Sequence, residues 1–349
     1  MKKTITIGEK CIGNDQPCFI IAEAGVNHNG SLAMAKKLVD VAVRAKADAV
    51  KFQTAKAEEV VIDNVEIADY AKRNMGKNTT QLAMIKKLVL PYNDFIILER
   101  YCRKKGIIFL STPHSYDAID FLDELVPAFK FGSGDITNIP ALKHAAKKGK
   151  PIILGTGMST LKEIQEAIKA IQSMQNNQII ALHCTTNYPC PVEEVNLRAM
   201  ITMQKKLDCM VGYSDHTLGV TIPIMAVALG AVVLEKHFTL NRNLPGPDHK
   251  ASLTPTELAI MVKEIRKTQT ALGSFEKKPT TSEKKIMNIV RKSIVTQTDI
   301  EKGTRLTMDL LSIKRPGTGI PPNKIDTLIG KKTKQSLKKD RIIQINMLE

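Results

Sequence analysis

AVVLEKHFT, at residues 231–239, joins four apolar residues directly to Glu235, Lys236 and His237, with no turn residue between them. A short apolar run of this kind is typical of a strand that is buried on both faces. Ionisable residues at its end indicate that the strand runs into a polar pocket. That interpretation depends on whether other strands of the chain end in the same way.

Seven other segments have this form, a near-continuous apolar run followed by polar residues. They are FIIAEAG (19–25), DAVKFQT (48–54), GIIFLSTPH (106–114), PAFKFGSGD (127–135), KPIILGTGMS (150–159), QIIALHCTTNYP (178–189) and CMVGYSDHT (209–217). Helix-like segments separate them, among them residues 31–47, with Ser31 as the expected N-cap, and residues 159–174, capped by Ser159 or Thr160.

Eight strand–helix alternations over about 260 residues predict an α/β fold of the (β/α)₈ TIM-barrel type. A doubly wound open sheet is the rival architecture, but no GxGxxG motif follows the first strand. We therefore expect a barrel in which the polar strand ends meet at one face.

Composition is that of a soluble globular protein, since 43% of the 349 residues are apolar and 25% are charged. The first residues lack the apolar core of a signal peptide. The apolar stretch IPIMAVALGAVVL is interrupted by Pro223 and Gly230 and is too short to span a membrane. Six scattered cysteines show no metal-site spacing, which favours free thiols in a reducing cytoplasm.

The net charge of +16 is concentrated near the C-terminus. Residues 277–349 contain 17 Lys and Arg against 7 Asp and Glu, a net charge of 17 − 7 = +10. The same segment contains no Phe, Tyr or Trp and so has no stacking platform for single-stranded nucleic acid. A solvated basic face is the simplest interpretation, and we expect neither nucleic acid nor membrane as a partner.

The chain divides into a barrel domain at residues 1–273, a polar linker at 274–287 and a small domain at 288–349. Short alternating runs and Gly/Pro turns predict that the small domain is rich in β-structure. Its KRPGTGI motif places Arg315 in a rigid loop that could present a guanidinium to a ligand.

The polar strand ends sort into two chemical groups. Lys51 and Lys130 end the second and fourth strands, and three hydroxyl residues are expected beside them, namely Thr112, Ser133 and Ser214. Lysines with hydroxyls and backbone amides suit a small anion such as a phosphate ester. His216 and His237 end neighbouring strands and, with Glu23, could hold a divalent metal. The alternative is that each histidine only makes hydrogen bonds within the loop layer.

Ten motifs in order give the chain a resemblance to the sialic acid synthase family, the nonulosonic acid synthases with a C-terminal antifreeze-like (SAF) domain. They are EAGVNHNGS, KFQT, STP, FKFGSGD, ILGTGMS, HCTTNYPCP, GYSDHT, EKHFT, LPGPDH and KRPGTG. The resemblance implies a TIM barrel followed by an antifreeze-like domain, and the condensation of phosphoenolpyruvate with an N-acylated mannosamine-type sugar. It also implies a divalent cation, Mn²⁺ with Mg²⁺ or Co²⁺ as alternatives, and a domain-swapped homodimer.

The resemblance assigns roles to these residues by motif. His216 and His237 would bind the metal, and Arg315 of the partner subunit would contact the N-acyl group. Phosphoenolpyruvate would be held by Lys51, Thr112, Lys130, Ser133 and Ser214. Sugar binding and proton transfer would fall to Glu23, Gln53, Asp135, Tyr188 and Asp248. Thr186, at the end of the sixth strand, is expected to contact substrate.

Three departures from the family pattern concern Asp135 in place of Glu, Gly155 in place of Ser and His114 in place of Phe. The first bears on the acceptor sugar. We expect N-acetylneuraminate synthase, using N-acetylmannosamine, with N,N'-diacetyllegionaminate synthase, using the 6-deoxy-2,4-diacetamido sugar, as the alternative. A shikimate-entry or octulosonate-type synthase would lack the C-terminal domain. An inactive barrel with a basic glycan- or nucleic-acid-binding tail is the non-enzymatic alternative.

Overall fold

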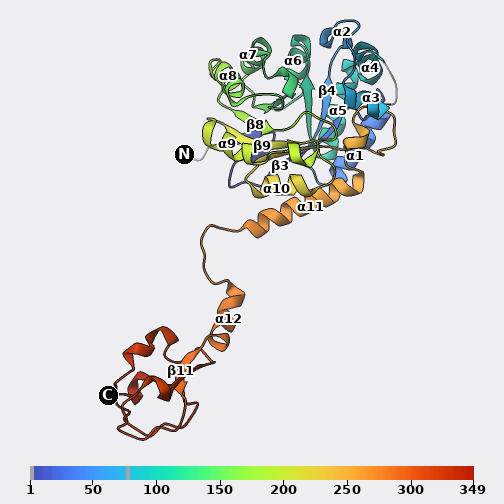
Figure 1. Cartoon of the computed structure of the whole chain (residues 1–349). Coiled ribbons are helices and arrows are strands. Elements are labelled where there is room, and N and C mark those ends of the chain that lie inside the picture. The colour runs from blue at the N-terminus through green and yellow to red at the C-terminus, as the bar shows by residue number, and fades with distance from the viewer. Residues whose placement is uncertain (1–3, 76–78) are drawn as a thin grey trace. The chain divides into compact units, whose positions relative to one another are not determined.

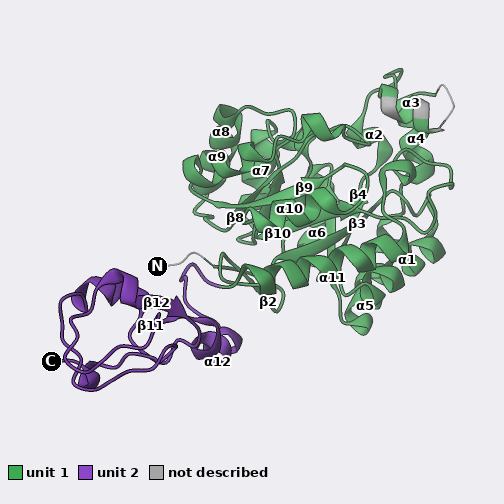
Figure 2. Cartoon of the chain, turned by 60° about the horizontal axis from the view of Figure 1, so that its bottom comes forward, with its two compact units in different colours: residues 1–273 green, residues 274–349 purple. Residues whose placement is uncertain are grey.

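The computed structural model describes residues 4–75 and 79–349. The chain forms two compact units, Met1–Gly273 and Ser274–Glu349, which are coloured separately in Figure 2. Unit 1 contains all eight of the predicted strands, and unit 2 contains the basic C-terminal segment.

Unit 1 is built on an eight-stranded parallel sheet in the order β5-β4-β3-β10-β9-β8-β7-β6. Its strands are β3 (Phe19–Gly25), β4 (Ala49–Thr54), β5 (Ile108–Pro113), β6 (Phe129–Phe131), β7 (Ile152–Gly155), β8 (Ile179–His183), β9 (Met210–Asp215) and β10 (Val233–His237). The first and last strands pair, because β10 forms a parallel ladder with β3, and the ends of this ordered sheet, β5 and β6, lie in contact. The predicted (β/α)₈ barrel is therefore confirmed.

Helices surround the sheet in unit 1 (Figure 1). They are α1 (Leu32–Arg44), α5 (Tyr92–Lys105), α6 (Tyr116–Asp123), α7 (Ile139–Ala146), α8 (Leu161–Gln172), α9 (Arg198–Lys206), α10 (Thr221–Ala228) and α11 (Pro255–Leu272). Ser31 caps α1 as predicted, and Thr160 rather than Ser159 caps α8 in a capping box with Glu163. The connection after β4 is longer than the others and adds α2 (Ala57–Val60), α3 (Asp69–Met75) and α4 (Gln81–Leu88), which the sequence analysis did not anticipate.

The pleat of the strands decides which side chains reach the barrel interior, because alternate residues point to opposite faces. In β10, Val233 belongs to the interior apolar cluster, whereas Leu234 belongs to the cluster between sheet and helices. Glu235 and His237 continue the inward series of Val233, and Lys236 continues the outward series. The same alternation in β3 and β4 places Glu23 and Lys51 inward.

A short N-terminal hairpin packs against the opposite end of the barrel. It consists of β1 (Ile5–Ile7) and β2 (Lys10–Ile12), which pair antiparallel. Ile7 and Ile12 are fully buried in the same cluster as Phe19 and Val233, at the N-terminal ends of β3 and β10. The hairpin thus supplies apolar packing at the end of the barrel away from the polar strand ends.

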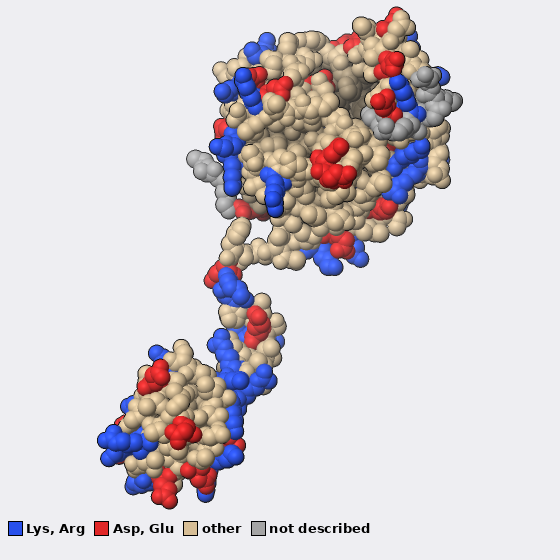
Figure 3. Space-filling model, in the orientation of Figure 1, with Lys and Arg blue, Asp and Glu red and all other residues tan. Residues whose placement is uncertain are grey.

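Unit 2 has its own apolar core around the antiparallel pair β11 (Ser293–Thr296) and β12 (Leu311–Lys314). Buried residues of this core include Ile294, Leu306 and Ile343. Helix α12 (Thr281–Val290) begins inside the segment 274–287 that was predicted to be a linker, so part of that segment is helical. On the face drawn in Figure 3, acidic side chains are interspersed among the basic ones of unit 2, both along α12 and elsewhere.

Across the described part of the chain, residues 4–75 and 79–349, no helix has both the length and the apolar character needed to cross a membrane.

Candidate active site

The inward residues at the C-terminal ends of the strands form one buried polar cluster, as the sequence predicts. Lys51 of β4 lies at its centre: its Nζ is 2.9 Å from Glu23 Oε2 and 3.8 Å from Glu235 Oε2, and it donates to Thr112 Oγ1 over 3.0 Å. Burial disfavours the charged form and acts to lower the pKa of Lys51. The negative charges of Glu23 and Glu235 together have the larger effect and raise this pKa overall. The ammonium is therefore present throughout the physiological range of pH.

Glu235 connects the two lysines and was not assigned a role from the sequence. Its Oε1 lies 3.4 Å from Lys130 Nζ and accepts from Ser214 Oγ over 3.1 Å. Burial acts to raise the pKa of Glu235, yet the positive charges of Lys130 and Lys51 lower it overall. Two lysines and two glutamates thus lie close together in this buried space. Their opposite charges offset one another, so the cluster carries little net charge.

Glu23 differs from Glu235 in its protonation. Burial raises the pKa of Glu23 to about 7, against the opposing pull of Lys51. Gln53 Nε2 donates to Glu23 Oε1 over 3.4 Å, so the carboxyl group is held between β3 and β4. A carboxyl group that titrates near neutral pH is suited to accept or donate a proton.

Ser133 lies in a tight arrangement of small groups beside Lys130. The amide of Gly157 donates to Ser133 Oγ over 3.0 Å and to Cys184 Sγ over 3.1 Å, and Ser133 Oγ lies 3.1 Å from that sulfur. A Cβ atom on Gly157 would stand 2.2 Å from Thr186 Oγ1 and 2.9 Å from Ser133 Oγ, so any larger residue there would have to displace these hydroxyls. Gly155, which stands where the family pattern has Ser, also lies close to its neighbours, because a Cβ there would be 3.0 Å from the Ser133 amide nitrogen.

His216 and His237 lie side by side, with ring centroids 5.6 Å apart, and Tyr188 packs against both at 4.1 and 5.6 Å. Burial lowers the pKa of His216 to about 4 and lowers that of His237 well below its usual value. Both imidazoles are therefore neutral at pH 7, the form in which histidine binds metals.

The histidine pair fits a divalent metal as two ligands of an open site. His216 Nδ1 lies 2.6 Å from the carbonyl oxygen of Thr185, which fixes the ring and leaves Nε2 available. His237 Nδ1 is buried and has no hydrogen-bond partner among the described residues. Those residues contain no group of three or more His, Cys, Asp and Glu arranged to hold a metal, and Glu23 Oε2 faces Lys51 instead. The remaining positions would fall to water or substrate.

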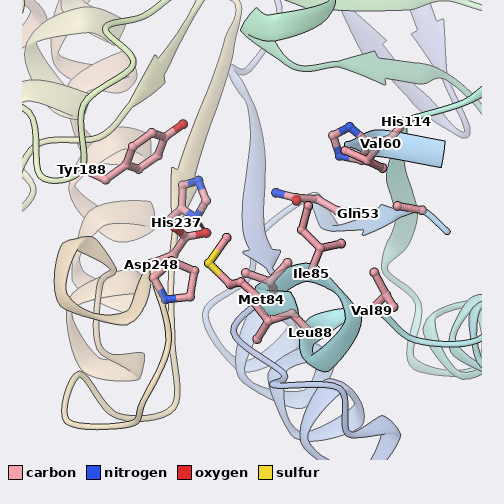
Figure 4. Close-up of a pocket in the computed structure, with 13 residues that line it drawn as sticks. Gln53, Val60, Met84, Ile85, Leu88, Val89, His114, Tyr188, His237 and Asp248 are labelled. Atoms are coloured by element: carbon pink, nitrogen blue, oxygen red, sulfur yellow. Dashed lines mark ion pairs between the residues drawn. The ribbon is translucent and has the colours of Figure 1, made fainter. Parts of the chain in front are cut away.

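A cavity of about 240 Å³ opens beside this cluster (Figure 4). Its polar lining residues are Gln53, His114, Tyr188, His237 and Asp248. Burial raises the pKa of Asp248 to about 6, whereas burial and the nearby lysines lower that of His114 to about 4. Asp135, in the turn after β6, also has its pKa raised to about 6 by burial.

Arg315 is set apart from the other predicted site residues because it belongs to unit 2. It is exposed directly after β12. No specific role was assigned from the sequence to Glu235, to Cys184 or to the apolar residues that line the cavity from α4. Glu235 was recognisable from its place two residues before His237, on the same face of the strand.

Comparisons with known proteins agree with this geometry. Residues 38–277 match the NeuB family and residues 291–349 match the SAF domain. The chain is 46% identical over 335 residues to N,N'-diacetyllegionaminic acid synthase of Legionella pneumophila, covering 95% of this chain and 94% of the relative. It is 37% identical over 342 residues to N-acetylneuraminate-9-phosphate synthase of Homo sapiens, covering 97% and 94%.

A crystal structure of the N-acetylneuraminic acid synthetase from Leptospira borgpetersenii, in complex with citrate, aligns with a TM-score of 0.74 at 36% identity, covering 82% of this chain and 95% of that one. The resemblance seen in the motifs is thereby confirmed over both units. The chain belongs to the NeuB family and is a phosphoenolpyruvate-dependent nonulosonic acid synthase with a C-terminal SAF domain.

Proposed function

We propose that the chain is an N,N'-diacetyllegionaminate synthase, which condenses phosphoenolpyruvate with 2,4-diacetamido-2,4,6-trideoxymannose and releases phosphate. The relative at 46% identity favours this acceptor over the N-acetylmannosamine expected first from the sequence, since the sialate-type relative stands at 37%. The structural observation that best supports this reaction is the buried Lys51–Glu235–Lys130 cluster next to His216 and His237.

Phosphoenolpyruvate would bind where the lysines converge. It carries roughly three negative charges, and the buried cations of Lys51 and Lys130, which Glu23 and Glu235 partly offset, would compensate part of them. The Ser133 hydroxyl, held in place by the Gly157 amide, offers a donor for a phosphate oxygen, and Thr112 and Ser214 offer hydroxyls near the lysines. Thr186, whose Oγ1 is buried without a hydrogen-bond partner among the described residues, would face the same anion.

His216 and His237 would hold the divalent cation, for which Mn²⁺, Mg²⁺ and Co²⁺ are candidates. When bound, the cation polarises the aldehyde of the open-chain sugar. Asp248 Oδ2 lies 3.9 Å from His237 Nδ1 and would orient a sugar hydroxyl, together with Gln53 and Tyr188 from the cavity lining. Asp135 would reach the sugar or manage a proton from its turn after β6.

The bond changes balance with one water molecule. C3 of phosphoenolpyruvate forms a bond to C1 of the sugar as the C1=O π bond breaks and its oxygen takes a proton. Water then adds to C2, the C2–O bond to phosphate breaks, and the second proton of the water leaves with the phosphate as the 2-keto group forms. Glu23, whose pKa is near 7 and rises further beside the bound anion, would first give its proton to the aldehyde oxygen, and the resulting carboxylate, paired with Lys51, would then take one proton of the water. The products are a nine-carbon 2-keto acid and inorganic phosphate.

Three further parts of the proposal concern the whole protein. The chain would act as a domain-swapped homodimer in the cytoplasm. Arg315 of the partner subunit would approach the N-acyl group of the sugar, because its rigid loop presents an exposed guanidinium. Replacing Arg315 by Lys should raise KM for the acceptor without changing KM for phosphoenolpyruvate.

The test of the function is phosphate release from phosphoenolpyruvate with Mn²⁺, measured with the 6-deoxy-2,4-diacetamido sugar, with N-acetylmannosamine and without sugar. We expect sugar-dependent release that is fastest with the 6-deoxy-2,4-diacetamido acceptor and is abolished by EDTA. Faster release with N-acetylmannosamine would overturn the proposed acceptor, and no release with either sugar would overturn the proposed reaction.

A further inference from the structure

The cavity beside the polar cluster has two chemically different sides. Gln53, His237 and Asp248 lie toward the strand ends. The part of the lining that α4 and the residue after it supply, which we call the apolar wall, consists of Met84, Ile85, Leu88 and Val89 (Figure 4). A sugar that binds with its aldehyde at the polar side and extends across the cavity would bring the far end of its carbon chain to this wall.

Helix α4 presents the wall because of its local sequence. Thr80 caps the helix by accepting from the Ala83 amide, which sets its first turn. Met84, Ile85 and Leu88 then fall on one face, at the spacing of a helical stripe. Lys86 turns away and forms an ion pair of 2.9 Å with Glu58 of α2. The charged side of the helix is thus outside the cavity.

We propose that the apolar wall contacts the substituent at C6 of the acceptor and favours a methyl group there, with Met84 and Ile85 as the specificity-determining residues. This inference rests on the proposed function, because it assigns a place to the 6-deoxy end of the acceptor. Met84 and Ile85 are half-buried and can therefore cover a ligand group from water. None of the wall side chains has a hydrogen-bonding group other than the weakly accepting sulfur of Met84.

A hydroxyl group at C6 would lose its water partners against this wall. Burying an unpartnered hydroxyl costs free energy, whereas burying a methyl group contributes favourably. Apolar pockets nevertheless reject an added hydroxyl only modestly, by up to about 100-fold in kcat/KM. We therefore expect a 10- to 100-fold preference for the 6-deoxy acceptor over its 6-hydroxy counterpart, about as much as an apolar contact can provide.

The same wall excludes a phosphate group at C6. Phosphoenolpyruvate adds three carbons, so C6 of the sugar becomes C9 of the product, and a 9-phosphate product requires a 6-phosphate acceptor. Binding such a group calls for Arg, Lys or clustered amides. Among the described residues that line the cavity none is Lys or Arg, and Asp248 adds negative charge above pH 6. A 6-phosphorylated acceptor should therefore be rejected more strongly than the 6-hydroxy acceptor.

The experiment compares kcat/KM for two sugars that differ only at C6, 2,4-diacetamido-2,4,6-trideoxymannose and 2,4-diacetamido-2,4-dideoxymannose. It is done on the full-length wild-type protein, on Met84→Gln, on Ile85→Thr and on the control Met225→Gln. Met225 is an exposed methionine on α10, outside the cavity lining. The ratio of the two acceptors is the readout, because a general loss of stability or activity leaves a ratio unchanged.

We expect the wild-type protein and Met225→Gln to prefer the 6-deoxy sugar by at least about tenfold, and Met84→Gln and Ile85→Thr to bring the ratio to within about threefold of unity. A wild-type ratio near unity, or an unchanged ratio in both wall variants, would overturn the inference while leaving the proposed function intact. Turnover of N-acetylmannosamine alone, with neither diacetamido sugar used, would overturn the proposed function and the inference together.

Discussion

Lys236 provides a quantitative test of how this barrel holds its two histidines. The pleat turns Lys236 and Asp215 outward from neighbouring positions on β10 and β9, each directly beside one of the histidines. Both side chains are 0% exposed, and the ammonium of Lys236 donates to Asp215 Oδ2 and to the carbonyl oxygen of Thr217. Replacing Lys236 by Met leaves the Asp215 carboxylate buried without a counter-charge.

Breaking a buried ion pair in this way costs about 3–5 kcal/mol of folding free energy. Asp215 keeps hydrogen bonds from the Tyr213 hydroxyl at 3.1 Å and from the Thr217 hydroxyl at 2.9 Å, which places the expected loss near the lower end. The double variant Lys236→Met/Asp215→Asn carries no charge at these two buried positions, and the amide oxygen of residue 215 still accepts from the Tyr213 hydroxyl. We expect it to recover at least half of the loss of the single variant.

The assay is urea denaturation followed by far-UV circular dichroism, with the midpoint compared between variants of equal slope. Lys267→Met is the matched control, because Lys267 is 74% exposed in its pair with Glu264 on α11 and such surface pairs contribute about 0–1 kcal/mol. A Lys236→Met variant that unfolds at the same urea concentration as Lys267→Met would refute this reasoning.

Three more outcomes can be measured directly. Binding of phosphoenolpyruvate should be accompanied by uptake of up to about half a proton at pH 7, because Glu23 has a pKa of about 7 and a nearby anion raises that pKa further. Calorimetry in buffers of different ionisation enthalpy measures this proton uptake. Uptake that persists in Glu23→Gln would contradict the assignment to Glu23. Gly157→Ala should lower kcat/KM for phosphoenolpyruvate by about 100-fold, because the new Cβ would displace Thr186. The control Gly134→Ala, with nothing within 4 Å of its Cβ, should behave as wild type. Equal rates for the two variants in steady-state assays would disprove the steric argument. His237→Ala should weaken Mn²⁺ binding at least about tenfold in a direct titration, and unchanged affinity would remove the histidine from the proposed metal site.

The strand ends could be predicted from the sequence because a strand has a period of two. Glu235 and His237 share a face whatever the rest of the fold does, and parallel strands bring their C-terminal ends to one side of a barrel. The same reasoning places Lys51 and Glu23 together, and the structure joins them at 2.9 Å. Local pattern and barrel topology suffice for this part of the site.

The remaining features depend on contacts between distant segments. The bridging role of Glu235 requires Lys51 and Lys130 to approach from opposite sides, which follows from side-chain reach and not from spacing along the chain. The contact of Cys184 with Ser133 joins positions that are 51 residues apart. The apolar wall comes from the long connection after β4, where the amphipathic α4 resembles any other surface helix in sequence.

Central to this account is the formation of a carbon–carbon bond at the buried lysine cluster. The most direct test supplies the Mn²⁺-loaded protein with phosphoenolpyruvate labelled with ¹³C at C3, together with 2,4-diacetamido-2,4,6-trideoxymannose, and follows the label by nuclear magnetic resonance. The account predicts that the label becomes a methylene carbon coupled to a sugar carbon, in step with phosphate release, and that Lys51→Met and Lys130→Met abolish the signal. Label that appears only in the methyl group of pyruvate would contradict it.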